Sequence, residues 1–110
     1  MKNLPPEHED FGFYMLKIVK RYTGLEYDLW CDSLGRLRDK SIRPYVMVPS
    51  YIVDGEWLVI DIVEDVVKEG NCIYFPKYKS VISYIKRNKK VFMKHWNGKM
   101  DDLDLIQNLR

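Results

Sequence analysis

Apolar residues near the start of the chain recur with the spacing of a helix. They are Phe11, Tyr14, Met15, Ile18, Val19 and Tyr22. Intervals of three and four residues place such side chains on one stripe of an α-helix. Pro5 and Pro6 suit a helix start, because the N–H groups that proline lacks have no partner there. Gly24 suits the position just after the last helical residue. The pattern predicts a helix that ends before Gly24.

Two later runs are typical of β-strands. Leu25 to Cys31 alternates between apolar and polar residues, as expected of a half-buried strand. Tyr45 to Val48 is a second apolar run, and Pro44 before it removes one backbone donor, which favours an edge strand or a strand start. Between the two runs, residues 32–35 predict a turn and residues 36–40 an exposed segment.

Residues 53–70 are compatible with two structures. Asp54-Gly55 could form a hairpin turn, with Trp57 to Val63 as the returning strand. On a helical wheel, however, the charged residues share one arc and the aliphatic residues fill the opposite one. The charged residues are Asp61, Glu64, Asp65, Lys68 and Glu69. We therefore predict a helix over residues 55–69, capped by Asp54 and ended by Gly70, although its β-branched residues disfavour a helix.

Over residues 72–109, the sequence pattern predicts two short strands and two helices. The strands are Cys72 to Phe75 and Val91 to Trp96, and the helices are Lys77 to Asn88 and Asp101 to Leu109. Residues 72–96 could form a βαβ crossover. The order α-β-β-α-β-α-β-α predicts an α+β fold. We expect a single domain over residues 1–110, in which three to four helices pack on a small mixed sheet of about four short strands.

Composition supports a folded chain and gives an expected compartment. Apolar residues make up 46% of the 110 positions, too many for a disordered segment. The polar start, Met1 to Asp10, does not have the pattern of a signal peptide, and no apolar run reaches the length of a membrane helix. We expect a cytoplasmic protein in which Cys31 and Cys72 are buried thiols. The abundance of lysine, isoleucine, tyrosine and asparagine suggests a bacterial or phage gene.

Candidate catalytic and metal-binding residues are few. His8 and His95 are the available imidazoles, and either cysteine could pair with His95 in a nucleophilic dyad. Zinc-ligand spacings and phosphate-binding glycine loops are absent from the sequence. Asp61, Glu64 and Asp65, at i, i+3 and i+4, could hold a hard cation on a helix, but acids at such positions are ordinary and a solvated helix face explains them better. We expect no cofactor, no metal and no enzymatic activity.

Charge is unevenly distributed along the chain. Residues 54–70 carry six acids against one lysine, whereas residues 71–99 carry eight bases and no acid. The basic residues are interleaved with aromatic residues, a combination that nucleic-acid binders use for phosphates and for base stacking. Such asymmetry affects association more than folding. The sequence leaves open whether the acidic and basic segments pair within one molecule.

Two functions follow from these patterns. The first is a non-catalytic protein-binding module, such as a stoichiometric inhibitor, an immunity-type or antitoxin-type protein, or a phage accessory protein. Its contact could be the acidic face or the basic segment, with a tryptophan (Trp30, Trp57 or Trp96) as anchor. The acidic face consists of Asp61, Glu64 and Asp65, and the basic segment of Lys86, Arg87, Lys89, Lys90, Lys94 and Trp96. The alternative is nucleic-acid binding through residues 77–99.

Overall fold

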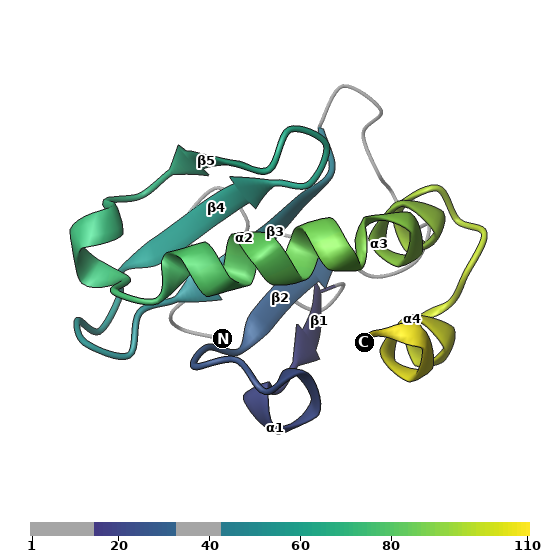
Figure 1. The fold of residues 1–110 in the computed structure, drawn as a ribbon, viewed down its shortest axis with the longest axis horizontal. Coiled ribbons are helices and arrows are strands. Elements are labelled where there is room, and N and C mark those ends of the chain that lie inside the picture. The colour runs from purple at the N-terminus through teal and green to yellow at the C-terminus, as the bar shows by residue number, and fades with distance from the viewer. Residues whose placement is uncertain (1–14, 33–42) are drawn as a thin grey trace.

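In the computed structural model, residues 15–32 and 43–110 are described, and they form a five-stranded antiparallel sheet with helices packed on it (Figure 1). The strands are β1 (Met15–Ile18), β2 (Leu29–Asp32), β3 (Tyr45–Pro49), β4 (Trp57–Asp61) and β5 (Val66–Glu69). The helices are α1 (Lys20–Thr23), the 3-10 helix η2 (Cys72–Tyr74), α2 (Tyr78–Arg87), α3 (Lys89–Trp96) and α4 (Asp102–Asn108). The α+β class expected from the sequence is confirmed, with five strands where about four were expected and antiparallel pairing where a mixed sheet was expected.

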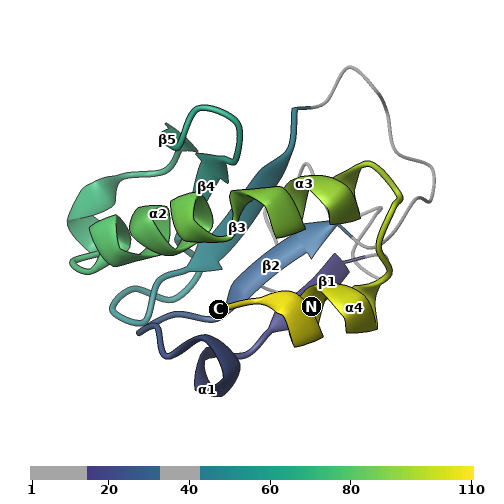
Figure 2. The same ribbon diagram turned by 45° about the vertical axis from the view of Figure 1, so that its right-hand side comes forward.

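Both faces of the sheet contain buried apolar residues. The main core lies between the sheet and helices α2, α3 and α4, which Figures 1 and 2 show on the same side of it. Its buried members include Ile18, Leu29, Val46, Val48, Leu58, Ile60, Val81, Tyr84, Ile85, Phe92 and Leu105. A second cluster, with the opposite side-chain alternation, contains Trp30, Tyr45, Met47 and Trp57. Successive residues of β2, β3 and β4 are therefore buried on alternate faces.

The helix predicted over residues 55–69 is wrong. The chain there forms the β4–β5 hairpin, in which Ile60 is paired with Val67 and Asp61 with Val66. The alternative prediction, a turn at Asp54-Gly55 followed by a strand from Trp57, is correct for the first half of this segment, where β4 lies. Because both faces of β4 are buried, its residues form a continuous apolar run that also fits one arc of a helical wheel. The β-branched residues, which disfavoured the helix, suit the strands.

The helix predicted from the first apolar stripe is also wrong over the part that is described. Met15–Ile18 is strand β1, paired with β2, and only the single turn of α1 follows it. The predicted end at Gly24 is confirmed: Gly24 is left-handed, with φ 77°, and its N–H donates to the Lys20 carbonyl at 2.8 Å. The predicted strand Leu25 to Cys31 is shorter, because β2 begins at Leu29. Residues 1–14 and 33–42, with their predicted turn and exposed segment, lie outside the described part.

Two further strand predictions are wrong. The βαβ crossover predicted over residues 72–96 is therefore wrong as well, because it needs both strands. Cys72 to Phe75 contains the 3-10 helix η2, which Asn71 caps by accepting a hydrogen bond from the Ile73 N–H at 3.0 Å. Val91 to Trp96 lies in helix α3, where Phe92 and His95 are the buried residues. Their separation of three positions is a helical period and not a strand period.

Helices α2 and α4 and strand β3 agree with their predictions. Asp101 caps α4, since its Oδ1 accepts a hydrogen bond from the Asp104 N–H at 2.8 Å. Strand β3 lies between β2 and β4 and is not an edge strand. Pro44 immediately precedes β3, which agrees with a strand start, the other position that proline tolerates.

Candidate interaction surface

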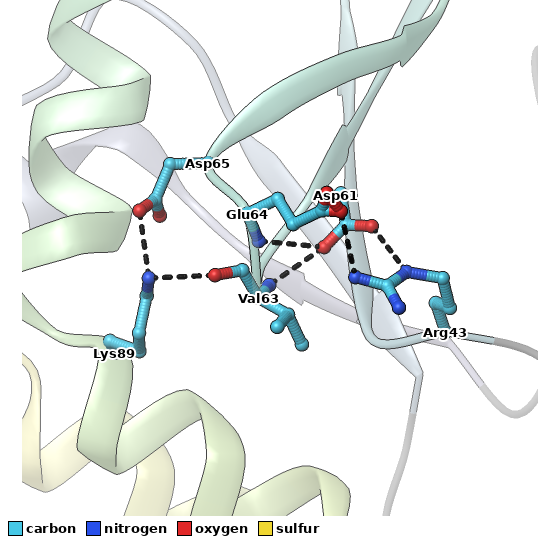
Figure 3. Close-up of polar contacts among 6 residues, drawn as sticks. All are labelled: Arg43, Asp61, Val63, Glu64, Asp65 and Lys89. Atoms are coloured by element: carbon cyan, nitrogen blue, oxygen red, sulfur yellow. Dashed lines mark hydrogen bonds and ion pairs between the residues drawn. The ribbon is translucent and has the colours of Figure 1, made fainter.

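The acidic face expected on a helix is instead the turn that joins β4 to β5. Asp61 ends β4 with 1% of its side chain exposed, and its Oδ1 accepts hydrogen bonds from the N–H groups of Val63 at 2.7 Å and Glu64 at 3.0 Å. Its other oxygen, Oδ2, accepts from Arg43 Nε at 2.7 Å (Figure 3). Asp61 therefore holds the turn together, and it is not accessible to a partner.

The pKa of Asp61 reflects two opposing effects. Burial raises it, because a charged carboxylate loses hydration. The hydrogen bond from Arg43 and those from the backbone N–H groups of Glu64 and Val63 lower it, and together they prevail, so the pKa of Asp61 lies below its ordinary value. The carboxylate is thus held in its charged form by the groups that it organises.

The other two acids of the turn also contact bases of the same molecule. Arg43 reaches Glu64 with Nη2 at 3.3 Å, although 59% of the Glu64 side chain remains exposed. Asp65 adopts φ 59°, a left-handed conformation that aspartate tolerates better than most residues, and its Oδ2 lies 2.7 Å from Lys89 Nζ. Lys89 Nζ also donates to the Val63 carbonyl at 3.0 Å, so that it clasps the turn to the start of α3 (Figure 3).

Some residues of the basic segment interact within the fold, and others do not. Lys89 forms an ion pair with Asp65 of the β4–β5 turn. Arg87 donates from Nε to the Arg110 carbonyl at 3.1 Å and lies over the Tyr84 ring, and half-buried Trp96 packs edge-on against Tyr45. Three lysines remain exposed with no ion pair to the described residues, and we call them the basic surface. They are Lys86, Lys90 and Lys94.

The aromatic residues of the basic segment face inward. Phe75, Tyr84 and Phe92 are buried in the main core. Tyr74 and Tyr78 are half-buried against the same core. Trp30 and Trp57, suggested as partner anchors, are 6% and 8% exposed and pack edge-on against each other in the second cluster. Few aromatic rings near the exposed lysines are therefore accessible for stacking against nucleic-acid bases.

His95 links two helices and is closed to solvent. Its Nε2 lies 2.7 Å from Asp102 Oδ1, which joins α3 to α4, and the residue is 2% exposed. The side chain at hydrogen-bond distance is thus an acid and not a thiol. Cys31 is buried and Cys72 half-buried. In the part of the chain that is described, no group of three His, Cys, Asp or Glu side chains could hold a metal ion.

Sequence reasoning missed a group of exposed apolar side chains on two turns. Tyr51 and Ile52, in the β3–β4 connection, are 52% and 55% exposed, and Ile73, in η2, is 73% exposed. We call these three residues the apolar turn surface. The signal available in the sequence was the presence of large apolar residues within the turn-rich stretches 49–55 and 71–76, where nothing requires them for a core period.

Comparison with protein-family models, with curated proteins and with solved structures finds no match for this chain. Across residues 15–32 and 43–110, none of the helices combines the length and the apolar character needed to cross a membrane.

Proposed function

We propose that this chain is a non-catalytic protein-binding module whose basic surface contacts an acidic partner protein. The proposal rests on a difference between the acidic and the basic residues: the acids of the β4–β5 turn are paired within the fold, whereas three lysines of the basic segment are exposed. Asp61, Glu64 and Asp65 are paired with Arg43 and Lys89 inside the fold. Lys86, Lys90 and Lys94 remain exposed on the helices that cover the sheet. Exposed, unpaired charge of one sign steers and selects oppositely charged partners.

This distribution favours one of the two contacts considered from the sequence. Asp61 is buried, and the side chain of Asp65 is 12% exposed. A partner could reach Asp61 or Asp65 only by displacing ion pairs that stabilise the turn, which leaves Glu64 as the one exposed acid of the face. The lysines of the basic surface carry no such constraint. A stoichiometric inhibitor, an immunity-type or antitoxin-type protein, or a phage accessory protein in the cytoplasm would fit this behaviour.

Nucleic-acid binding is the second candidate, and the same lysines support it. Phosphates could contact Lys86, Lys90 and Lys94 without any base readout. Single-stranded nucleic acid, however, is held largely by stacking on exposed aromatic rings. Because the rings of this segment are buried or half-buried, duplex phosphate contacts are the form of this function that the surface favours.

The test compares two variants of equal net charge. The first carries Lys86→Gln, Lys90→Gln and Lys94→Gln, and the control carries Lys20→Gln, Arg21→Gln and Lys68→Gln at other exposed positions. We expect affinity capture from the source cell to recover the same partner with wild type and control. The purified partner should bind the first variant about 10-fold more weakly, since each exposed ion pair contributes roughly 0.2–1 kcal/mol.

Three outcomes separate the candidates. Equal binding of the partner by both variants would remove the basic surface from the proposal. Recovery of no protein, together with salt-sensitive fluorescence anisotropy of labelled duplex DNA, would replace protein binding with nucleic-acid binding. If neither a protein nor a nucleic acid binds, the proposal that this chain is a binding module is contradicted as a whole.

A further inference from the structure

The apolar turn surface is formed where two connections meet at one end of the sheet. Ser50 Oγ, at the start of the β3–β4 connection, donates to the Tyr74 carbonyl of η2 at 2.7 Å. This bond brings the turn that carries Tyr51 and Ile52 against the turn that carries Ile73. Figure 1 shows the β3–β4 connection beside the segment between β5 and α2.

Hydrogen bonds hold both turns in shape. Ser50 Oγ accepts from the N–H groups of Ile52 at 3.0 Å and Val53 at 3.1 Å. On the opposite turn, the side chain of Asn71 accepts from the Ile73 N–H at 3.0 Å. The exposed isoleucines are therefore presented by ordered backbone. A contact made through them has little backbone entropy left to lose, which favours affinity.

Tyr51, the tyrosine of the apolar turn surface, packs against the buried ring of Tyr27. The ring of Tyr51 lies 4.9 Å from the ring of Tyr27, centroid to centroid, and Tyr27 is 2% exposed. The Tyr27 hydroxyl in turn accepts a hydrogen bond from the Lys77 N–H at 3.1 Å, next to the start of α2. Tyr51 thus has one face on the core and 52% of its surface in solvent, an arrangement common among aromatic anchors of interfaces.

The charges on the α2 side of this surface indicate the chemistry of a partner. Three residues separate η2 from α2, and both Lys77, the residue before α2, and Lys79, in its first turn, are exposed. No acidic residue occurs between Asn71 and Lys99. A partner with carboxylates facing the start of α2 would therefore complement these lysines.

We propose that Tyr51, Ile52 and Ile73 are the anchor of this chain on its partner protein, which offers an apolar pocket bordered by carboxylates on the α2 side. This inference rests on the proposed protein-binding function and names the surface that supplies its affinity. The lysines of the basic surface then act on the rate and selectivity of association, and the apolar residues determine how long the complex lasts.

The experiment places a photoreactive residue at single positions of the full chain. Benzoylphenylalanine replaces Tyr51 or Ile73, and at matched exposed apolar positions it replaces Val63 or Leu103, which are 43% and 62% exposed. We expect irradiation in the source cell to join positions 51 and 73 to one protein of a different sequence, and positions 63 and 103 to none. That protein should then bind the variant with Ile52→Ser and Ile73→Ser about 100-fold more weakly, and the variant with Val63→Ser and Leu103→Ser like wild type.

Other outcomes overturn the proposal in distinguishable ways. If affinity capture recovers a partner that positions 51 and 73 do not join, or if it binds the double isoleucine variant like wild type, only the anchor is wrong. An adduct with the mass of two copies of this chain would show that the surface self-associates. If neither capture nor irradiation recovers a protein, the protein-binding function and the anchor are both overturned.

Discussion

Lys89 and Asp65, separated by 24 positions in the sequence, form an ion pair of 2.7 Å between the start of α3 and the β4–β5 turn. Lys89 belongs to the segment with eight bases and no acid, and Asp65 to the segment with six acids. The two oppositely charged segments of the chain therefore neutralise each other in part within one molecule. This pairing decides which charges remain for association.

Removal of Lys89 should destabilise the fold. Asp65 Oδ1 is already buried without a hydrogen-bond partner among the described residues, so Lys89→Met would leave the whole carboxylate without its ion pair. We expect a loss of about 2 kcal/mol in the free energy of unfolding, measured by urea denaturation. Lys90→Met, at the next and exposed position, should change it by less than about 0.5 kcal/mol. Equal effects of the two substitutions would show that the ion pair contributes nothing specific.

Asp61 should make stability depend on pH in the acid range. Because the pKa of Asp61 is lower in the folded state than the unfolded value of about 3.9, its contribution is complete above that value and is lost as pH falls through the folded pKa. Asp61→Asn should cost about 2 kcal/mol at pH 7. The difference between wild type and variant should shrink below about pH 4. Denaturation at a series of pH values measures both curves.

Glu64→Gln is the control for Asp61, since 59% of the Glu64 side chain is exposed. We expect a change of less than about 0.5 kcal/mol at pH 7. A difference between wild type and Asp61→Asn that stays constant down to pH 2 would contradict the assignment of acid sensitivity to Asp61.

Gly70 should tolerate no side chain. Its φ is 100°, and a Cβ there would lie 2.3 Å from the Trp57 carbonyl oxygen, which belongs to the neighbouring strand β4. We expect Gly70→Ala to cost about 3 kcal/mol in thermal or chemical denaturation. Gly55→Ala is a matched control, because φ is 86° and nothing lies within 4 Å of its Cβ. It should cost only about 1 kcal/mol, from backbone strain. Similar losses at both positions would mean that strain alone, and not the close approach, sets the cost.

Asn88 should anchor the end of the chain to the junction of α2 and α3. It is 2% exposed, donates from Nδ2 to the Tyr84 carbonyl at 2.9 Å, and accepts from the Arg110 N–H at 2.7 Å. Asn88→Ala should lower the free energy of unfolding by about 2 kcal/mol and increase amide hydrogen exchange in α4. Asn108→Ala, at an exposed position of α4, should have less than half that effect. Unchanged exchange in α4 after Asn88→Ala would contradict the anchoring role.

The parts of the fold that follow one period could be predicted from the sequence. In α2, the buried residues Val81, Tyr84 and Ile85 recur at helical intervals, and the helix was found within two residues of its ends. β4 could not be assigned in this way, because a strand buried on both faces has no polar face to reveal its period. The first apolar stripe failed for another reason: β1 is stabilised by pairing with β2, a contact that helical spacing cannot represent.

The sequence could predict which residue types form the candidate surfaces, but not which of those residues interact within the fold. Lys86, Lys90 and Lys94 were named from charge alone, and they remain exposed. The ion pairs of Arg43 and Lys89 with the acidic turn join residues 18 to 24 positions apart. No local spacing encodes such distances. The apolar turn surface was missed because its residues obey no period, and only the fold shows that they remain in solvent.

The strand order of the sheet has a consequence for how the chain acquires its structure. Each strand pairs with the strand that precedes or follows it, so the sheet can grow by closing one hairpin after another. Chain closure over short separations loses little entropy before the new contacts form, and folding rates rise as the separation between contacting residues falls. Over residues 15–32 and 43–110, the β3–β4 hairpin has the longest ladder, with five paired positions, and is a natural first step. The architecture thus favours early pairing of neighbouring strands, while the main core is complete only once α2, α3 and α4 pack on the sheet.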